Sequence, residues 1–146
     1  MALDELLLDE FMAHATRTGE RLTISGPQVR LKTRAAETIS LAIHELATNS
    51  VKFGALGSDE GHIEVTWRNV LTIQGGAILK LQWIERGVPN IDPKPAHRGF
   101  GTDMIRNSLA FELAAETMLD YTQDGLRIVI DIPITPQLLH EPISEN

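Results

Sequence analysis

The sequence predicts an α+β fold in which helices cover one face of a mixed, mainly antiparallel sheet. One long helical pattern precedes two strands whose apolar residues alternate, at 62–68 and 78–85. A further helical pattern, at 104–114, then precedes two strands that a short turn joins. Strands that gather late in the chain, with helices before and between them, are typical of a two-layer sandwich.

Composition limits the classes of function. The chain has 146 residues, of which 42% are hydrophobic and 23% charged, ordinary values for one globular domain. The net charge of −7 argues against nucleic acid as a partner, because binding phosphates needs a basic surface. The sequence has no cysteine and its five histidines show no ligand spacing, so it predicts neither disulfides nor a thiolate metal site. No segment predicts a signal peptide or a membrane span, so we expect a cytoplasmic domain without membrane contact.

The first third of the chain predicts two helices and two short strands. Ala2–Ala15 is rich in helix formers with apolar residues at helical spacing. Residues 21–25 read as a short strand, and residues 29–31 as a second one after a Gly-Pro turn. Thr33 is a candidate cap for the long helix, which we expect to run to about Phe53.

The long helix has two unlike faces. At about 100° per residue, Glu45, Asn49 and Lys52 fall within about 60° of one another. The apolar face lies opposite and comprises Ile39, Ile43, Leu46, Ala47 and Ser50. A polar stripe is also usual on solvated surface helices, so the helix alone leaves open whether this stripe binds a ligand.

The two strands that follow have a clear alternation. Each is expected to bury every second residue against the helices, because side chains of a strand point to opposite faces in turn. The residues expected on the buried face are Ile63, Val65 and Trp67 in the first strand and Leu79, Leu81 and Trp83 in the second.

The segment Arg86–Arg98 differs in kind from the rest. It contains prolines at 89, 93 and 95 and shows no periodicity, which predicts a long loop. We expect the part of this loop from Val88 to Arg98 to act as a lid over a binding site. Arg98, at its end, is placed to reach a phosphate, although a solvated loop charge explains it equally well.

The last third predicts a helix, a hairpin and a tail. The helix at 104–114 has the core candidates Met104, Ile105, Leu109 and Leu113. Residues 117–121 and 126–132 form the expected hairpin across Gln-Asp-Gly. The segment after Pro133 is expected to fray, since it has two more prolines and little apolar periodicity.

Three local features could together serve a nucleoside triphosphate and a metal. Asn49 offers a neutral oxygen suited to Mg²⁺, and Lys52 a positive charge for a phosphate. Glu85 can accept the exocyclic amine of adenine, while Gly87 permits close approach of the backbone. Gly-Phe-Gly-Thr at 99–102 presents backbone N–H groups at a helix N-terminus, where phosphate is favoured.

Each feature also has a structural explanation. A Gly-x-Gly before a helix can be an ordinary helix start, and Glu85 can be a solvated strand end. Trp83 can be a core residue, and His44 a hydrogen-bonded histidine at the edge of the core. The ordered set is more specific than its members.

The ordered set resembles the Bergerat-type (GHKL) ATP-binding domain of sensor histidine kinases, and more narrowly its HWE class. The class is named for a histidine in the N box and a Trp-x-Glu in the first glycine box, which here are His44, Trp83 and Glu85. GFGTDMI, at 99–105, resembles the second glycine box, and DGLRIVIDIP resembles the last strand of the family.

The resemblance runs from about Leu3 to Pro133 and implies a Bergerat-type sandwich. It implies an ATP-binding catalytic domain at 1–134, and we expect a flexible tail at 135–146. Such domains bind ATP with Mg²⁺ and pass the γ-phosphoryl group to a histidine of a separate helical dimerisation domain. A response regulator then receives the phosphoryl group.

Motif matches imply the roles of individual residues. Glu45 corresponds to the acid that assists the attacking histidine, with His44 beside it as a second catalytic candidate, and Asn49 to the metal-binding asparagine. Glu85 stands where other histidine kinases have an adenine-reading aspartate. The full set expected to bind nucleotide is Asn49, Lys52, Glu85, Gly87, Arg98, Gly99, Phe100, Gly101 and Thr102.

The sequence departs from the family pattern in two ways. Val88 replaces the second glycine of the first glycine box, which bears on the flexibility of the loop more than on adenine binding. No pair of dimerisation helices with a phosphoacceptor histidine is evident, because His14 lacks basic neighbours. The chain therefore reads as an excised catalytic domain or as part of a split kinase.

Two other functions fit the same fold. One is a non-catalytic module that docks a response regulator without using ATP, and ATP binding separates it from a kinase. The other is a serine kinase of the anti-sigma type, whose phosphoserine product survives acid, whereas phosphohistidine does not. His44 and the Trp-x-Glu pair favour the histidine kinase.

Overall fold

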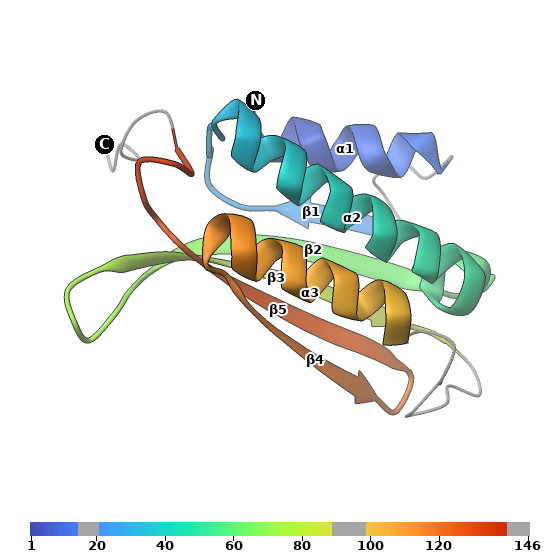
Figure 1. The fold of residues 1–146 in the computed structure, drawn as a ribbon. Helices are drawn as coiled ribbons and strands as arrows, with labels where there is room; N and C mark the ends of the chain where they lie inside the picture. The colour runs from blue at the N-terminus through green and yellow to red at the C-terminus, as the bar shows by residue number, and fades with distance from the viewer. Residues whose placement is uncertain (15–20, 89–98, 140–146) are drawn as a thin grey trace.

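The computed structural model describes residues 1–14, 21–88 and 99–139. Within these ranges the chain forms three α-helices, one 3-10 turn and five strands (Figure 1). They are α1 (Leu3–Ala13), β1 (Leu22–Ser25), α2 (Thr33–Phe53), η1 (Ala55–Gly57), β2 (His62–Leu71), β3 (Ala77–Arg86), α3 (Gly99–Leu113), β4 (Glu116–Thr122) and β5 (Gly125–Pro133).

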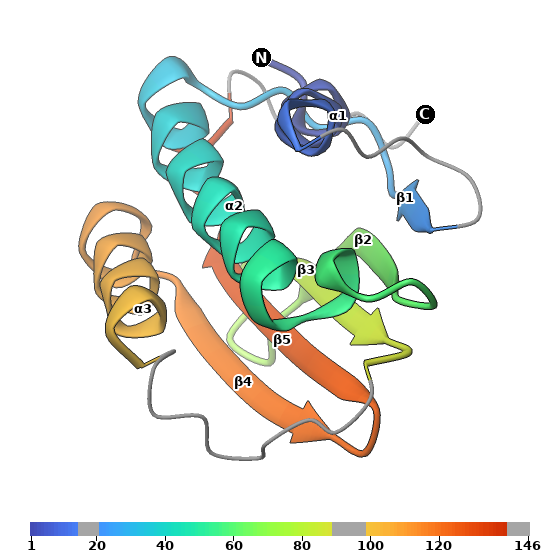
Figure 2. The same cartoon turned by 90° about the vertical axis from the view of Figure 1, so that its right-hand side faces the viewer.

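The described strands form one sheet in the order β1-β2-β3-β5-β4. β1 runs parallel to β2, whereas the other neighbouring strands pair antiparallel. The three helices lie on the same side of this sheet, with α2 between α1 and α3 (Figures 1 and 2). The predicted α+β class, with helices on one face of a mixed and mainly antiparallel sheet, is confirmed.

The core lies between the helices and the sheet, where the alternation of the strands places it. All six residues predicted for the buried face of β2 and β3 are buried. β3 is central, and Trp83 pairs with Val65 on β2 and with Ile128 on β5. Because these pairs share one face of the sheet, they form a continuous apolar layer beneath α2.

The long helix also follows its predicted pattern. α2 ends at Phe53, and the five residues expected on its apolar face are all buried. The predicted cap at Thr33 is wrong, because Lys32 is the N-cap residue and no side chain caps the helix. The backbone closes the first turn instead, with the Ala36 nitrogen donating to the Lys32 carbonyl at 2.8 Å.

The segment at 29–31 and the segment after Pro133 pair with each other, and neither has the structure that the sequence predicts. Residues 29–31 do not form the predicted strand, since Arg30 and Leu31 make only isolated bridges. Leu31 pairs with Leu139, and Leu138 and Leu139 are both buried in the core. The expected fraying after Pro133 is therefore wrong as far as Leu139, because these two leucines supply apolar area that holds the chain down. Residues 140–146 lie outside the described part.

The last helix is longer than predicted, and one of its predicted core residues is exposed. α3 begins at Gly99, and Ile105 and Leu109 are buried as expected, with Leu113 partly buried. Met104 is 46% exposed, so its assignment to the core is wrong. The pair at 105 and 109 faces the sheet, and Met104 lies about 100° away around the helix. The predicted hairpin is confirmed as β4 and β5.

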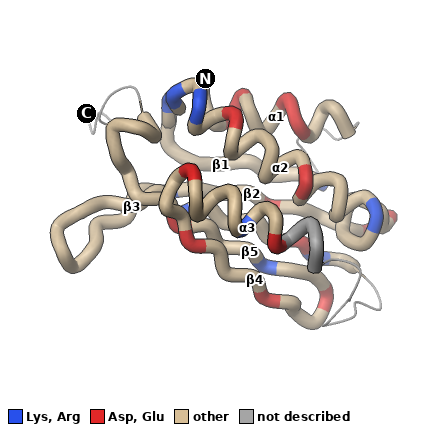
Figure 3. Tube along the Cα trace, in the orientation of Figure 1, with Lys and Arg blue, Asp and Glu red and all other residues tan. Residues whose placement is uncertain are grey.

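Charged residues are spread over the helices and the sheet, and the described helices are not of the membrane-spanning kind. Figure 3 shows acidic positions on all three helices and on β4, with basic positions interspersed. Among the helices in the described ranges, none has the length and apolarity needed to cross a membrane.

Candidate functional site

Glu85 lies at the end of β3 and is the most deeply buried charged residue among those described, with 2% of its surface exposed. Its Oε1 accepts hydrogen bonds from the Ser50 hydroxyl at 3.1 Å and from the Ala55 backbone nitrogen at 2.9 Å. Its Oε2 accepts one from the indole nitrogen of Trp83 at 2.8 Å. Burying a carboxylate is costly unless donors replace water, and here three donors do so.

The local sequence explains this burial. Trp83 and Glu85 are two positions apart in a strand, so both side chains point towards α2. Gly54 ends α2 beside them, and a Cβ atom at this position would lie 2.2 Å from Oε1 of Glu85. Any side chain at residue 54 would therefore displace the carboxylate.

A narrow pocket opens beside Glu85, between α2 and the last three strands. Asn49 lines it from the helix and Glu85 from β3, and the remaining lining residues are Leu46, Leu119, Tyr121, Leu126 and Ile128. The structure thus brings together the residues predicted to bind the metal and to read the base. Asn49 and Glu85 share the pocket with largely apolar neighbours, and the space between them is small, with room for about one water molecule.

Asn49 is half-buried in this pocket. Within the described parts of the chain its side-chain amide makes no hydrogen bond, so both its oxygen and its nitrogen are available to a ligand. Glu85 also keeps capacity, because Trp83 is the one donor to Oε2 among the described residues, and a carboxylate oxygen accepts two hydrogen bonds.

Lys52 lies in a neighbouring hollow rather than in the pocket of Asn49. The lining residues of this hollow are Lys52, Phe53, Gly54, Gly57, Ser58, Asp59, Glu60, Gly87, Val88 and Asp124. Gly87 has a positive φ of 76°, and a Cβ atom there would lie 2.2 Å from the Glu60 carbonyl oxygen. The glycine is therefore required by the turn at the end of β3 and by its approach to residue 60.

The loop between α2 and β2 is held by a residue that the sequence did not single out. The Arg21 guanidinium donates to the carbonyl oxygens of Ala55, Ser58 and Gly61. The Ala55 nitrogen is one of the donors to Glu85, so Arg21 shapes the backbone that contacts the carboxylate.

Val88 is anchored at the start of the proline-rich loop. It is 7% exposed, and its backbone nitrogen donates to the Asp124 carbonyl in the β4–β5 turn at 2.8 Å. The Ser58 hydroxyl also donates to the carbonyl of Gly87 at 3.0 Å. The residue that replaces a glycine in the family pattern therefore packs in the core.

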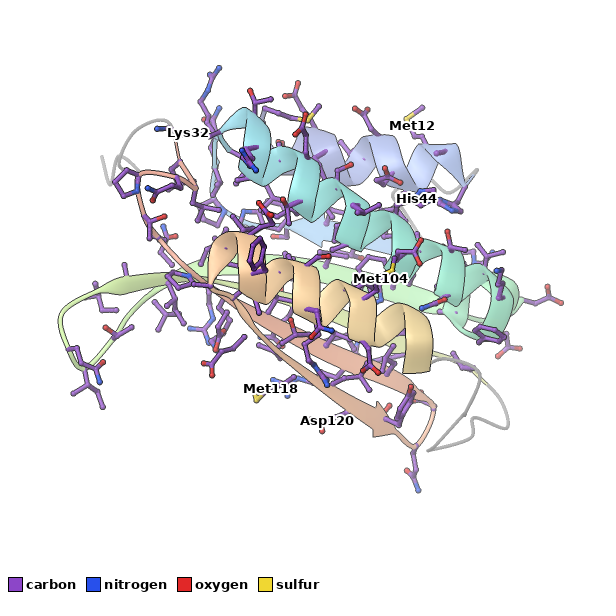
Figure 4. All side chains as sticks on the ribbon, in the orientation of Figure 1. Met12, Lys32, His44, Met104, Met118 and Asp120 are labelled. Atoms are coloured by element: carbon purple, nitrogen blue, oxygen red, sulfur yellow. The ribbon has the colours of Figure 1, made fainter. Side chains whose placement is uncertain are left out.

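His44 lies on another side of α2. Its Nδ1 is 3.0 Å from Oε2 of Glu10 on α1, and its ring is 5.5 Å from that of His14. Figure 4 shows His44 between α1 and α2. Around the helix axis it is about 140° from Asn49, so the structure does not bring it to the pocket. Glu45, by contrast, is half-buried and lies about 40° from Asn49 around the helix axis, so the two residues share the polar face of α2.

The remaining predicted residues belong to the loop and to the start of α3. Arg98 and the rest of the expected lid from residue 89 onwards lie outside the described residues, whereas Val88, the first residue of the expected lid, is buried. Gly99, Phe100, Gly101 and Thr102 form the first turn of α3, as the helix-start prediction requires, and their side chains lie outside the description.

Two contributors to the site were missed at the sequence level. Ser50 was assigned only to the apolar face of α2, and Ala55 only to a loop. A serine among apolar residues on a buried helix face was the available signal, because a buried hydroxyl needs a partner. The backbone donor at Ala55 had no such signal in its side chain.

A curated relative matches most of the chain. The blue-light-activated histidine kinase of Brucella anthropi is 37% identical over 124 residues, which cover 82% of this chain and 25% of that protein. The chain therefore spans about a quarter of the length of this relative. No protein-family model matches the sequence.

Solved structures share the fold. The histidine kinase domain of the Erythrobacter litoralis EL346 blue-light-activated histidine kinase has a TM-score of 0.64 at 23% identity, over 92% of this chain and 60% of that one. The catalytic domain of the histidine kinase ThkA, in a nucleotide-free form, has a TM-score of 0.62 at 13% identity, over 91% of this chain and 94% of that one. At these identities the likeness establishes the arrangement of helices and strands.

Proposed function

Because this chain belongs to the histidine kinases, with the fold of their catalytic domain, we propose that it binds ATP with Mg²⁺ and phosphorylates a histidine. The observation that carries the proposal is the pocket in which Asn49 and Glu85 meet. His44, Trp83 and Glu85 further agree with the HWE class of the family.

The pocket offers the groups that an adenine base would need, but its walls must move apart to admit the ring, because the space beside Glu85 holds about one water molecule. Glu85 has acceptor capacity left on Oε2, where it would accept a hydrogen from the exocyclic amine. The apolar residues of β4 and β5, among them Leu119 and Ile128, would contact the ring. The base would displace water from this apolar wall, which favours binding.

Asn49 and Lys52 would serve the phosphate end. The Asn49 amide oxygen is a hard neutral ligand, and Lys52 is exposed one turn further along α2. Among the described residues no group of three or more acidic or histidine side chains could hold a metal by itself. Mg²⁺ is commonly held by one or two protein groups together with substrate phosphates, whose charge it neutralises, so the Asn49 oxygen would be one ligand and the phosphates would supply others.

Glu45 would act at the reacting end. It lies one turn before Asn49 on α2 and is half-buried, so it could hold the imidazole of an incoming histidine in position. In the reaction a bond forms between an imidazole nitrogen and the γ-phosphorus, and the bond to the leaving ADP breaks. The histidine would come from a helical dimerisation domain of a longer protein, and a response regulator in the cytoplasm would then receive the phosphoryl group.

Calorimetric titration with a non-hydrolysable ATP analogue tests the proposal. Binding that requires Mg²⁺ and is lost in Asn49→Ala is the expected result, and a chain that binds no nucleotide would refute it. Labelled ATP added with a matching dimerisation domain should give an acid-labile product. An acid-stable product would instead indicate a serine kinase.

A further inference from the structure

Ser50 makes two hydrogen bonds at once in the interior of the domain. Ser50 has 1% of its surface exposed and lies on the face of α2 that packs on the sheet. The hydroxyl oxygen accepts from the Leu56 nitrogen at 3.0 Å. Its single proton is then left for the Glu85 carboxylate, whose Oε1 is 3.1 Å away.

The bonds at Glu85 leave one place for a ligand. Oε1 already accepts from Ser50 and from the Ala55 nitrogen, which uses both of its lone pairs. Oε2 accepts from Trp83, and within the described residues it has one lone pair remaining. The donors to Oε1 help to fix the plane of the carboxylate, and this plane sets the direction of the remaining lone pair of Oε2.

We propose that Ser50 is a positioning residue for base recognition: its hydroxyl holds the Glu85 carboxylate so that Oε2 faces the pocket. The inference rests on the proposed function, since it specifies how the nucleotide base is read. Ser50 follows Asn49 in α2, so the same hydrogen bond joins the helix that carries Asn49 to the strand that carries Glu85. It therefore also sets the spacing between the base end and the metal end of the pocket.

The chain offers a matched control on the same helix. The Ser40 hydroxyl also donates to a glutamate, Oε1 of Glu10, at 3.3 Å. That contact lies between α2 and α1, away from the pocket. Ser40→Ala therefore removes the same chemical group from the same helix without touching Glu85.

The first test needs no nucleotide. The two tryptophan indole N–H groups give separate NMR signals, and Trp67 donates to the Pro27 carbonyl at 2.7 Å, far along the sheet from Glu85. In Ser50→Ala the Trp83 signal should shift and exchange faster with solvent, while the Trp67 signal stays unchanged. Ser40→Ala should leave both signals in place. An unchanged Trp83 signal in Ser50→Ala would overturn the inference.

The second test measures base recognition, with Mg²⁺ present, as the ratio of the dissociation constants of purine riboside triphosphate and ATP. The first nucleotide lacks the exocyclic amine. Ser50→Ala should lower this preference for ATP by about threefold to tenfold, whereas Ser40→Ala should keep it. Equal weakening of both nucleotides would show a merely structural role and would overturn the inference. A wild-type chain that binds neither nucleotide would refute the proposed function itself, and with it this role.

Discussion

The indole nitrogen of Trp83 donates a hydrogen bond to Oε2 of Glu85 at 2.8 Å, and the two residues lie next to each other on one face of β3. The Trp-x-Glu spacing thus forms a hydrogen bond inside the core. Together with the donors to Oε1, it surrounds the carboxylate with N–H and O–H groups. All of these contacts require an acceptor at residue 85.

Glu85→Gln should therefore destabilise the fold by about 1–3 kcal/mol, because the amide nitrogen must face a donor and one buried bond is lost. Chemical denaturation measures the loss. In a Trp83→Phe background, where the indole donor is absent, the same change should cost about 1 kcal/mol less. Additive losses in the double mutant would show that the two side chains do not interact.

Asn49→Ala should abolish Mg²⁺-dependent nucleotide binding and leave the free energy of unfolding almost unchanged. The amide is half-buried and makes no hydrogen bond within the described residues, and alanine has the higher helix propensity, by about 0.5 kcal/mol. Calorimetric titration measures the nucleotide binding, and thermal unfolding measures the stability. Thr38→Ala, about 16 Å away along α2, is the control and should bind nucleotide normally. An Asn49→Ala chain that binds Mg-nucleotide like the wild type would exclude the metal role.

His44→Ala should leave the dissociation constant for Mg-nucleotide within about twofold, because the side chain faces α1 rather than the pocket. The loss of its partly exposed contact with Glu10 should cost no more than about 1 kcal/mol of stability. Glu10→Gln is the matched control, since it weakens the same contact from the other helix. Loss of nucleotide binding in His44→Ala alone would show that His44 acts in the pocket after all.

Arg21→Met should loosen the loop that begins at Ala55. Three carbonyl oxygens lose a charged donor, and bonds of this kind contribute about 1.5–3 kcal/mol each when fully formed. Hydrogen exchange at the Ala55 amide should become faster, and the melting temperature should fall. Arg68→Met removes an exposed arginine from β2 and should change neither quantity. Unaltered exchange at Ala55 would mean that Arg21 does not hold the loop.

The sequence by itself determined most of the elements and the buried faces of α2, β2 and β3, but not the cap of α2 or the exposure of Met104. Periodicity in α2, β2 and β3 is a local property, because it reports which residues of one element face the same way. It therefore located Asn49 on the polar side of α2 and Trp83 on the buried face of β3, whereas the burial of Glu85 two residues later was not predicted. The resemblance added the roles of these residues before any contact between them was known.

Tertiary structure alone decided which residues meet. The position of α2 on the sheet brings Ser50 and the Ala55 nitrogen to Glu85, and the position of α1 takes His44 to Glu10. Leu139 is buried for the same reason, since it pairs with Leu31 from the far end of the chain. These contacts depend on how separate elements pack, and a pattern that repeats within one element carries no information about its neighbours.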